Sequence, residues 1–280
     1  MFSGVNSRPI RQMSSTTSQQ IVAPSVQLIK NSSHPPTRIL GVKMPKATVI
    51  VPTYNRSDEL SGMLTSLARQ TCREFEVLVI DDASAKPIAD QISESGWPFK
   101  LRIKRNEKNS GPGKSRNTGV LLARSDLLLF TDDDCRPDPG WVEYFILAME
   151  SAGADVGGLG GQTLAEGKDI FSRYYDFHRL LDPLPHDRNN PDYIPYLVTA
   201  NCAVRKDALL HSGGFDGRIP SAGGEDVAAS LRMVKSGYVL KRCPDALVYH
   251  RFRPGLRDVW KTCYRYGLGG RFVVDRYLPL

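Results

Sequence analysis

Three consecutive carboxylates, Asp132, Asp133 and Asp134, are the residues of this chain best suited to do chemistry. They directly follow an apolar run over residues 127–131 that predicts a buried strand. Adjacent anions repel one another, so a fold keeps three of them together when a cation lies among them. Carboxylate oxygens at this density suit Mg²⁺ or Mn²⁺, often shared with substrate phosphates. A solvated acidic turn is the commoner explanation of such a cluster, and the elements around it decide between the two.

Residues 46–151 alternate between predicted strands and predicted helices. This succession indicates an α/β fold with a largely parallel sheet. The carboxyl ends of parallel strands lie at one edge of a sheet, so the polar residues that follow the strands would meet there. The predicted strands cover residues 46–51, 75–80, 99–104 and 127–131, the helices cover 57–68, 86–95 and 141–151, and the polar residues are Thr53, Tyr54, Asp81, Asp82 and the Asp cluster.

A glycine-rich run over residues 111–119 opens a further helix. It contains Gly-Lys-Ser but is not a P-loop, because that motif needs a glycine at position 108, where this chain has Lys. Arg116 lies in the first turns of the helix, and a helix N-terminus beside an arginine favours anions. A tight turn with a solvated Arg116 fits this segment equally well.

The pattern changes after residue 152. Two adjacent acids, Glu225 and Asp226, open a helix after two glycines, and a late strand ends on His250. Acids at a helix start can simply complement the helix dipole, and a lone His at a strand end is usually structural. Both become candidates only if the sheet brings them near the Asp cluster. The other predicted elements here are an aromatic-rich helix over 169–182 and strands over 156–162, 196–204 and 246–249.

The net charge of +7 is concentrated at the two ends of the chain. Residues 1–46 hold six Lys and Arg and no acid, and residues 251–280 hold seven against two Asp, which leaves the middle mildly acidic. This distribution argues against a nucleic-acid-binding body and indicates basic edges. Residues 1–45 are rich in Ser, Thr, Gln and Pro and are predicted to be a flexible basic tail.

The last predicted helix has an apolar face with Leu256, Val259, Trp260 and Cys263, and it is basic elsewhere. A basic amphipathic helix with Trp and Tyr is typical of elements that lie on a membrane surface. A helix that docks on the core with its basic side in solvent fits equally well. The glycines within residues 267–270 are expected to interrupt it.

The chain contains no apolar run near the ~20 residues that a transmembrane helix needs. Its five cysteines are odd in number and widely spaced, so they indicate neither a zinc site nor a disulfide framework. We therefore expect a cytoplasmic location. Within the cytoplasm, the protein could attach peripherally to the inner face of the membrane.

Several short motifs occur together and in order, and the ordered set resembles the family 2 glycosyltransferases of the GT-A fold. The similarity covers roughly residues 46–265. Each motif alone is weak, but the ordered set is highly specific. The motifs are VIVPTYNR (49–56), VIDDAS (79–84), GPGKSRNTG (111–119), the Asp cluster (132–134), GGFD (213–216), GED (224–226) and His250.

The resemblance implies a GT-A-type, Rossmann-like α/β fold whose mostly parallel sheet is flanked by helices, with a C-terminal acceptor-side half. Residues 46–250 would form the catalytic domain, in which residues 46–151 bind the nucleotide and residues 152–250 the acceptor. Residues 251–280 would form a basic amphipathic helix segment.

The resemblance also implies inverting transfer of a sugar from a nucleotide-diphosphate donor, with a UDP-sugar favoured, to an acceptor hydroxyl. Asp226 matches the catalytic base, with Glu225 as its neighbour, since the hydroxyl must lose a proton as it attacks. Mg²⁺ or Mn²⁺ would stabilise the leaving diphosphate. The implied metal ligands are Asp134, Asp132 and His250, and the implied nucleotide-binding residues are Pro52, Thr53, Tyr54, Arg56, Asp82, Arg116, Asp132 and Asp133.

The expected partners are the nucleotide sugar, an acceptor such as a glycan, a lipid-linked molecule or a small molecule, and an anionic membrane surface under the last helix. One alternative is a sugar-1-phosphate nucleotidyltransferase, which should carry a longer glycine-rich loop where this chain has residues 52–56. Another is a catalytically silent module that binds nucleotide sugars or glycans, and donor turnover would separate it from an enzyme.

Overall fold

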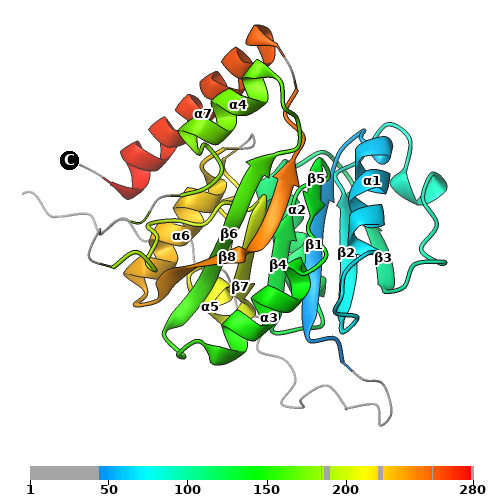
Figure 1. Ribbon diagram of the computed structural model, residues 1–280, viewed down its shortest axis with the longest axis horizontal. Coiled ribbons are helices and arrows are strands. Elements are labelled where there is room, and N and C mark those ends of the chain that lie inside the picture. Colours follow the sequence, from blue (N-terminus) through cyan, green and yellow to red (C-terminus); the bar gives the residue numbers. More distant parts are fainter. Residues whose placement is uncertain (1–43, 184, 186–189, 220–222, 254, 279–280) are drawn as a thin grey trace, which may run out of the picture. The chain divides into compact units, whose positions relative to one another are not determined.

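The computed structural model describes residues 44–183, 185, 190–219, 223–253 and 255–278. The predicted tail therefore lies outside the described residues, apart from its last two positions. The described residues form an eight-stranded sheet with helices on both faces (Figure 1). The strands are β1 (Ala47–Thr53), β2 (Phe75–Asp81), β3 (Lys100–Arg105), β4 (Leu127–Thr131), β5 (Cys135–Pro137), β6 (Val156–Ala165), β7 (Asn201–Arg205) and β8 (Val239–His250). The α-helices are α1 (Ser57–Leu67), α2 (Pro112–Leu122), α3 (Trp141–Ser151), α4 (Ile170–His178), α5 (Lys206–His211), α6 (Glu225–Lys235) and α7 (Leu256–Tyr277).

The N-terminal half of the sheet has the predicted α/β order. Strands β3, β2, β1 and β4 lie side by side in that order and are parallel. β1 lies inside the sheet because its side chains are apolar on both faces: Val49 faces one core cluster and Ile50 the other. The register pairs Thr53 with Asp81, so the polar ends of β1 and β2 are level.

The second half of the sheet is mixed. β7 is antiparallel to both β4 and β6, whereas β6 and β8 are parallel. The short strand β5, which the sequence did not predict, follows the Asp cluster directly and pairs antiparallel with β8. This pairing sets Cys135 opposite His250 and so brings the end of β8 to the Asp cluster.

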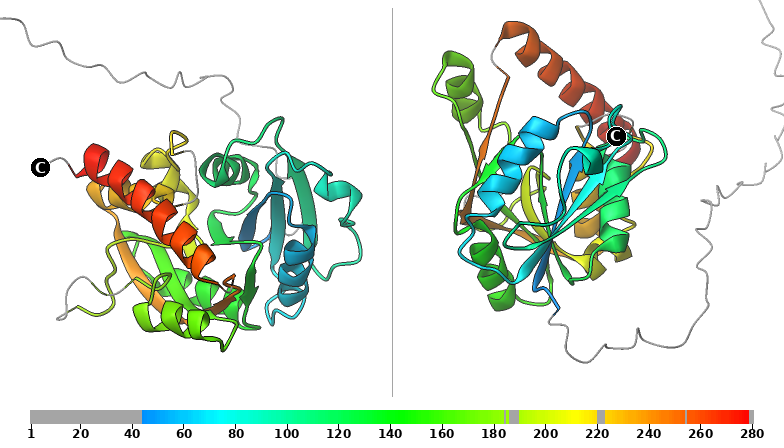
Figure 2. Two further views of the ribbon diagram at one scale, coloured as in Figure 1. Left: turned by 90° about the horizontal axis from the view of Figure 1, so that it is seen from above. Right: turned by 90° about the vertical axis from the view of Figure 1, so that its right-hand side faces the viewer.

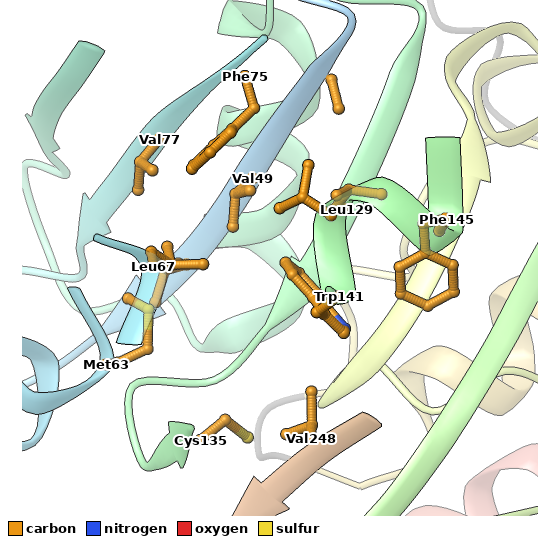
Figure 3. Close-up of a cluster of buried hydrophobic side chains, with 14 of the residues drawn as sticks. Val49, Met63, Leu67, Phe75, Val77, Leu129, Cys135, Trp141, Phe145 and Val248 are labelled. Carbon is orange, nitrogen blue, oxygen red and sulfur yellow. The ribbon is translucent and has the colours of Figure 1, made fainter. Parts of the chain in front are cut away.

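The larger apolar core lies between the sheet and the helices α1 and α3 (Figure 3). Met63, Leu67, Trp141 and Phe145 are buried there without exposed surface. Trp141 also donates its indole N–H to Asn201 Oδ1 at 2.8 Å, which fastens α3 to β7. A second core lies on the other face, where α2, α5 and α6 pack. Since helices cover both faces, the strand ends are the open part of the sheet.

Several predicted elements differ from the structure. The helix predicted at 169–182 ends at His178, because Arg179 adopts a left-handed φ of 49°, and the strand predicted at 246–249 is the end of β8, which begins at Val239. Residues 86–95 form only a short 3-10 turn, Ile88–Asp90. The strand predicted at 196–204 begins at Asn201, because Leu197 N donates to Ser230 Oγ of α6 instead of to a neighbouring strand. The glycines do not interrupt the last helix, since α7 runs unbroken from Leu256 to Tyr277. The helix α5 was not predicted.

One face of α7 docks on the rest of the domain, which is one of the two alternatives that the sequence left open (Figure 2). Val273 is buried against Ala228 of α6, with Phe272 and Tyr277 beside it. This packing offsets the roughly 1 kcal/mol that each glycine costs in a helix relative to alanine. Among the described residues, no helix is both long and apolar enough to span a membrane.

Candidate active site

Asp133 joins the end of β4 to the end of β1. Thr53 Oγ1 donates to Asp133 Oδ2 at 2.8 Å, and the Arg56 guanidinium donates to Oδ1 at 2.7 Å. The side chain is buried, and burial raises the pKa of Asp133 to about 7 despite the opposing charge of Arg56. Both carboxylate oxygens are thus bonded within the protein. A direct contact between Asp133 and a nucleotide stays a prediction, and its observed contacts hold the loop after β1 in place.

Asp134 and His250 form the pair best suited to hold a divalent cation. His250 Nε2 lies 3.3 Å from Asp134 Oδ1, and His250 Nδ1 is buried with no hydrogen-bond partner among the described residues. Burial alone would raise the pKa of Asp134, but the charges of His250 and Arg56 lower it below its ordinary value. A carboxylate oxygen close to an imidazole that has one unpaired ring nitrogen is a suitable ligand pair for Mg²⁺ or Mn²⁺. Asp132 lies outside this pair, and its Oδ1 accepts a hydrogen bond from Arg116, so its role as a metal ligand stays a prediction.

Cys135 lies within ligand distance of Asp134 and His250, yet its thiol is directed into the core. Figure 3 shows its side chain among the apolar side chains near Trp141 and Val248. The thiol contacts the Ala200 carbonyl at 3.7 Å, and burial raises its pKa well above the ordinary value. A protonated thiol is a poor ligand for Mg²⁺ or Mn²⁺, so Cys135 does not belong to the candidate metal site.

Arg116 connects the Asp cluster to the acids of α6. Its guanidinium donates to Asp132 Oδ1 at 2.7 Å and to Glu225 Oε1 at 2.8 Å. The Arg116 side chain is only 3% exposed, so the alternative of a solvated arginine is wrong. Burial opposes its charge, but the two carboxylates raise its pKa and keep it cationic. The helix can begin here because Gly111 adopts a φ of 86° and Pro112 supplies the first turn.

The two acids at the start of α6 have different surroundings. Glu225 is buried and uses both oxygens, one for Arg116 and one for the Gly223 N–H at 2.7 Å. Among the described residues, Asp226 accepts hydrogen bonds only from backbone N–H groups, those of Val227 at 2.8 Å and Thr199 at 3.4 Å. Burial and the neighbouring Glu225 charge raise the pKa of Asp226 to about 7. Asp226 thus differs from Glu225 in having no arginine partner among the described residues, and its raised pKa suits proton exchange near neutral pH.

Asp82 holds the glycine-rich turn that precedes α2. It accepts hydrogen bonds from the Ser110 N–H at 3.0 Å, the Gly111 N–H at 2.8 Å and the Asn106 side chain at 2.8 Å. The structure does not connect Asp82 to the Asp cluster by any hydrogen bond between described residues. Its contact with a nucleobase stays a prediction, as does that of Pro52. Tyr54 is 47% exposed at this edge, so its ring is open to a ligand.

The sequence missed the contribution of α7 to this site. Tyr266 lies so close to the turn before Glu225 that a Cβ atom on Gly223 would meet its ring at 3.0 Å. Burial raises the pKa of Tyr266, and the charges of Asp226 and Asp132 act in the same direction, so its hydroxyl stays protonated. Gly269 approaches the same turn through its backbone, because a Cβ atom there would lie 1.9 Å from the Gly223 oxygen. The only sequence signal was the spacing of Tyr266, Gly269 and Val273 on one helical face.

Comparison with known proteins identifies the family of the chain. The family model described as glycosyl transferase family 2 matches residues 48–212. A pre-mycofactocin glycosyltransferase of Mycobacterium tuberculosis is 31% identical over 218 residues, which are 75% of this chain and 44% of that protein. Glycosyltransferase AglE of Haloferax volcanii is 29% identical over 81% of this chain and 73% of its own length. The chain thus spans less than half the length of the first of these relatives.

Solved structures share the fold at lower identity. TarS of Staphylococcus aureus, residues 1–349 in complex with UDP-GlcNAc, has a TM-score of 0.59 and 22% identity over 76% of this chain and 60% of that one. The mannosyltransferase PcManGT of Pyrobaculum calidifontis, in complex with GDP-Man and Mn²⁺, has a TM-score of 0.59 and 21% identity over 78% of this chain and 60% of that one. These likenesses confirm the GT-A-type α/β fold, and the family match removes the support for a nucleotidyltransferase. The chain belongs to glycosyl transferase family 2.

Proposed function

We propose that this domain transfers a sugar from a nucleotide-diphosphate donor to an acceptor hydroxyl with inversion of the anomeric centre. The observation that carries the proposal is the Arg116 bridge, which joins Asp132 in the Asp cluster to Glu225 beside Asp226. One buried cation thus fixes the donor side and the acceptor side relative to each other. A UDP-sugar is the favoured donor, in line with the UDP-GlcNAc complex of TarS, and the GDP-Man complex of PcManGT makes GDP the next nucleotide to test.

The donor site would be formed by the ends of β1, β2 and β4. The exposed ring of Tyr54 can stack on a base, and Asp82 and Asp133 hold the two loops that surround it. Asp134 and His250 would hold Mg²⁺ or Mn²⁺, with Asp132 as the proposed third ligand, and the Mn²⁺ in the PcManGT structure supports the use of a divalent metal. When bound, the metal would neutralise charge on the leaving diphosphate.

Asp226 would act as the base. With a pKa of about 7, a useful fraction of this carboxyl is ionised at neutral pH and can accept the proton of an attacking hydroxyl. Glu225 is held in an ion pair by Arg116, whereas Asp226 has no ion-pair partner among the described residues, so we assign the proton transfer to Asp226. Attack from the face opposite the leaving group, in a single displacement, would invert the centre.

Calorimetric titration with UDP, GDP, TDP and CDP, with and without Mn²⁺, would test the donor site. We expect tight, Mn²⁺-dependent binding of one nucleotide, and the Asp226→Asn variant should bind it within about threefold of the wild type, because it keeps the shape of the site. The same variant should lose about 10²- to 10⁴-fold in turnover, as expected for a missing general base. Asp245→Asn, at an exposed position of β8, is the matched control. A comparable loss of nucleotide affinity in Asp226→Asn would contradict the base assignment.

We further propose a cytoplasmic location for the domain. The five cysteines are all free, and Cys135, Cys202 and Cys243 are buried, which suits a reducing compartment. The acceptor would bind on the side of Asp226, in the C-terminal half of the domain.

A further inference from the structure

The outward face of α7 carries an apolar stripe that packs on no other described element. Its members recur every four residues and lie on the side opposite to the buried Gly269 and Val273. The rings of Trp260 and Tyr264 stack on each other with centroids 5.3 Å apart. The stripe consists of Leu256, Trp260, Tyr264 and Leu268, which are 78%, 65%, 57% and 53% exposed.

Basic side chains run along this stripe. Arg257, Lys261 and Arg265 are all exposed and follow one border of it at the same four-residue spacing. Within the described part of the chain, none of the three forms an ion pair. Arg265 lies over the Tyr266 ring at 5.6 Å and keeps its positive charge. Three exposed positive charges beside exposed aromatic side chains are the features of a helix that lies in the interface of an anionic bilayer.

Helix α4 extends this surface. Ile170, Tyr174 and Phe177 lie on one face of α4 and are 75%, 41% and 83% exposed. The opposite side of α4 contacts α7, since the Tyr175 hydroxyl interacts with the Thr262 side chain. Figures 1 and 2 show both helices at the same end of the domain. We call the exposed faces of α4 and α7 together the α4–α7 surface.

We propose that the α4–α7 surface docks on an anionic lipid bilayer. The seven large apolar side chains named above are exposed on these two helices, which marks an interaction site, and the adjacent positive charge selects the partner. A second copy of the chain is a poorer occupant, because a two-fold interface would place the same arginines and lysines opposite one another. Trp and Tyr side chains suit the headgroup region, where one end of the ring is in an apolar layer and the other in water.

Docking on lipid would place the active site beside the membrane surface. The inner face of α7 contacts the turn that carries Glu225 and Asp226, through Gly269 and Tyr266. A second connection runs from the candidate metal site: the His250 and Phe252 rings stack at 4.4 Å, and the Phe252 and Tyr175 rings at 3.8 Å. This part of the inference rests on the proposed function, and it deepens that proposal by assigning the acceptor to the lipid surface.

Sedimentation with vesicles tests the docking without any activity assay. The full chain should bind vesicles that contain phosphatidylglycerol in phosphatidylcholine and should bind pure phosphatidylcholine much more weakly. Replacing Arg257 and Lys261 by Gln should weaken binding to the anionic vesicles about 25-fold, or about fivefold for each charge. Lys86→Gln with Lys104→Gln, two exposed lysines outside this surface, should change it little.

The apolar part of the surface has its own variants. Trp260→Ser should weaken vesicle binding about tenfold, since it removes a large apolar side chain from the bilayer interface. Leu121→Ser, at a position of α2 that is 73% exposed, is the matched control. Trp260 fluorescence should shift to shorter wavelength when anionic vesicles are added, and Trp260→Phe should lose that shift. Thermal unfolding and nucleotide titration of each variant establish that it is folded.

Equal binding to anionic and neutral vesicles, or no binding to either, would overturn the proposal. Self-association that Trp260→Ser abolishes, seen by analytical ultracentrifugation without lipid, would assign the surface to a second copy and would also overturn it. Failure of the proposed function gives a different result, because vesicle binding would persist while no nucleotide binds. Failure of the docking would leave Mn²⁺-dependent nucleotide binding intact.

Discussion

The contrast between Glu225 and Asp226 gives a prediction about pH. If Asp226 is the base, the rate must follow its ionised form, so kcat/KM should rise with pH through a midpoint of about 7. A single ionisation at that midpoint makes the rate about tenfold higher at pH 8 than at pH 6. The Glu225 charge is the nearest charge that raises this pKa, while Arg116 lowers it.

The variant Glu225→Gln should therefore shift the midpoint to lower pH. The amide keeps an oxygen for Arg116 or for the Gly223 N–H, but the negative charge is gone, and the freed Arg116 charge then acts on Asp226. A shift of one unit would reduce the difference between pH 6 and pH 8 from about tenfold to about twofold.

The assay is release of the nucleoside diphosphate from the donor that titration selects, measured from pH 5.5 to 8.5. Donor and Mn²⁺ affinities are measured by calorimetry at each pH. This separates the pH dependence of binding from the ionisation of the catalytic base. Asp133 also has a pKa of about 7, but it contacts Thr53 and Arg56 instead of Glu225. A wild-type midpoint that Glu225→Gln leaves in place would refute the assignment of Asp226 and would point to Asp133 or to the metal site.

Three further changes test other contacts. Asp134→Ala should reduce the Mn²⁺-dependent part of donor affinity about tenfold or more in calorimetry, and an unchanged metal requirement would remove Asp134 from the site. Thr53→Val should lower the free energy of unfolding by about 1–3 kcal/mol in urea, because it leaves a buried oxygen of Asp133 without its donor; equal stability would mean that Arg56 alone holds Asp133. Gly269→Ala should lower the melting temperature and turnover together, because its Cβ would lie 1.9 Å from the Gly223 oxygen. Gly267→Ala, with open space around it, should raise the free energy of unfolding by up to about 1 kcal/mol and so raise the melting temperature. Equal effects of the two alanines would disprove the close contact of α7 with the turn.

The sequence predicted the parts of the fold that depend on local pattern. The β-branched run of β1, the apolar run of β4 and the amphipathic segment of α3 each fix an element, and their order fixes a parallel half-sheet. The meeting of Thr53 with Asp133 follows from that order, since both lie at carboxyl ends of neighbouring parallel strands. The resemblance to family 2 then supplied roles for residues whose types the pattern had already singled out.

Contacts between residues far apart in the chain could not be predicted from the sequence. β5 has three residues, too few to show a period, yet its pairing with β8 is what brings His250 to Asp134. Glu225 and Asp226 are adjacent and chemically similar, so no sequence pattern separates them. The two acids differ because of Arg116, which lies 109 positions before Glu225. Arg116 donates a hydrogen bond to Glu225 and not to Asp226.

The glycines of α7 show the same limit in a single helix. A glycine within a helix lowers the stability of that helix relative to alanine. For this reason the glycines within residues 267–270 were predicted to interrupt the helix. Gly267 has open space where a side chain would be, so it contributes only that cost. Gly269 faces the backbone of Gly223, where any side chain would push α7 away from the turn that carries Glu225 and Asp226. The same residue type is thus dispensable at one position and structurally required two residues later, and the difference depends on a turn more than 40 residues earlier in the chain. The helix tolerates the cost because its inner face packs closely on that turn and on α6.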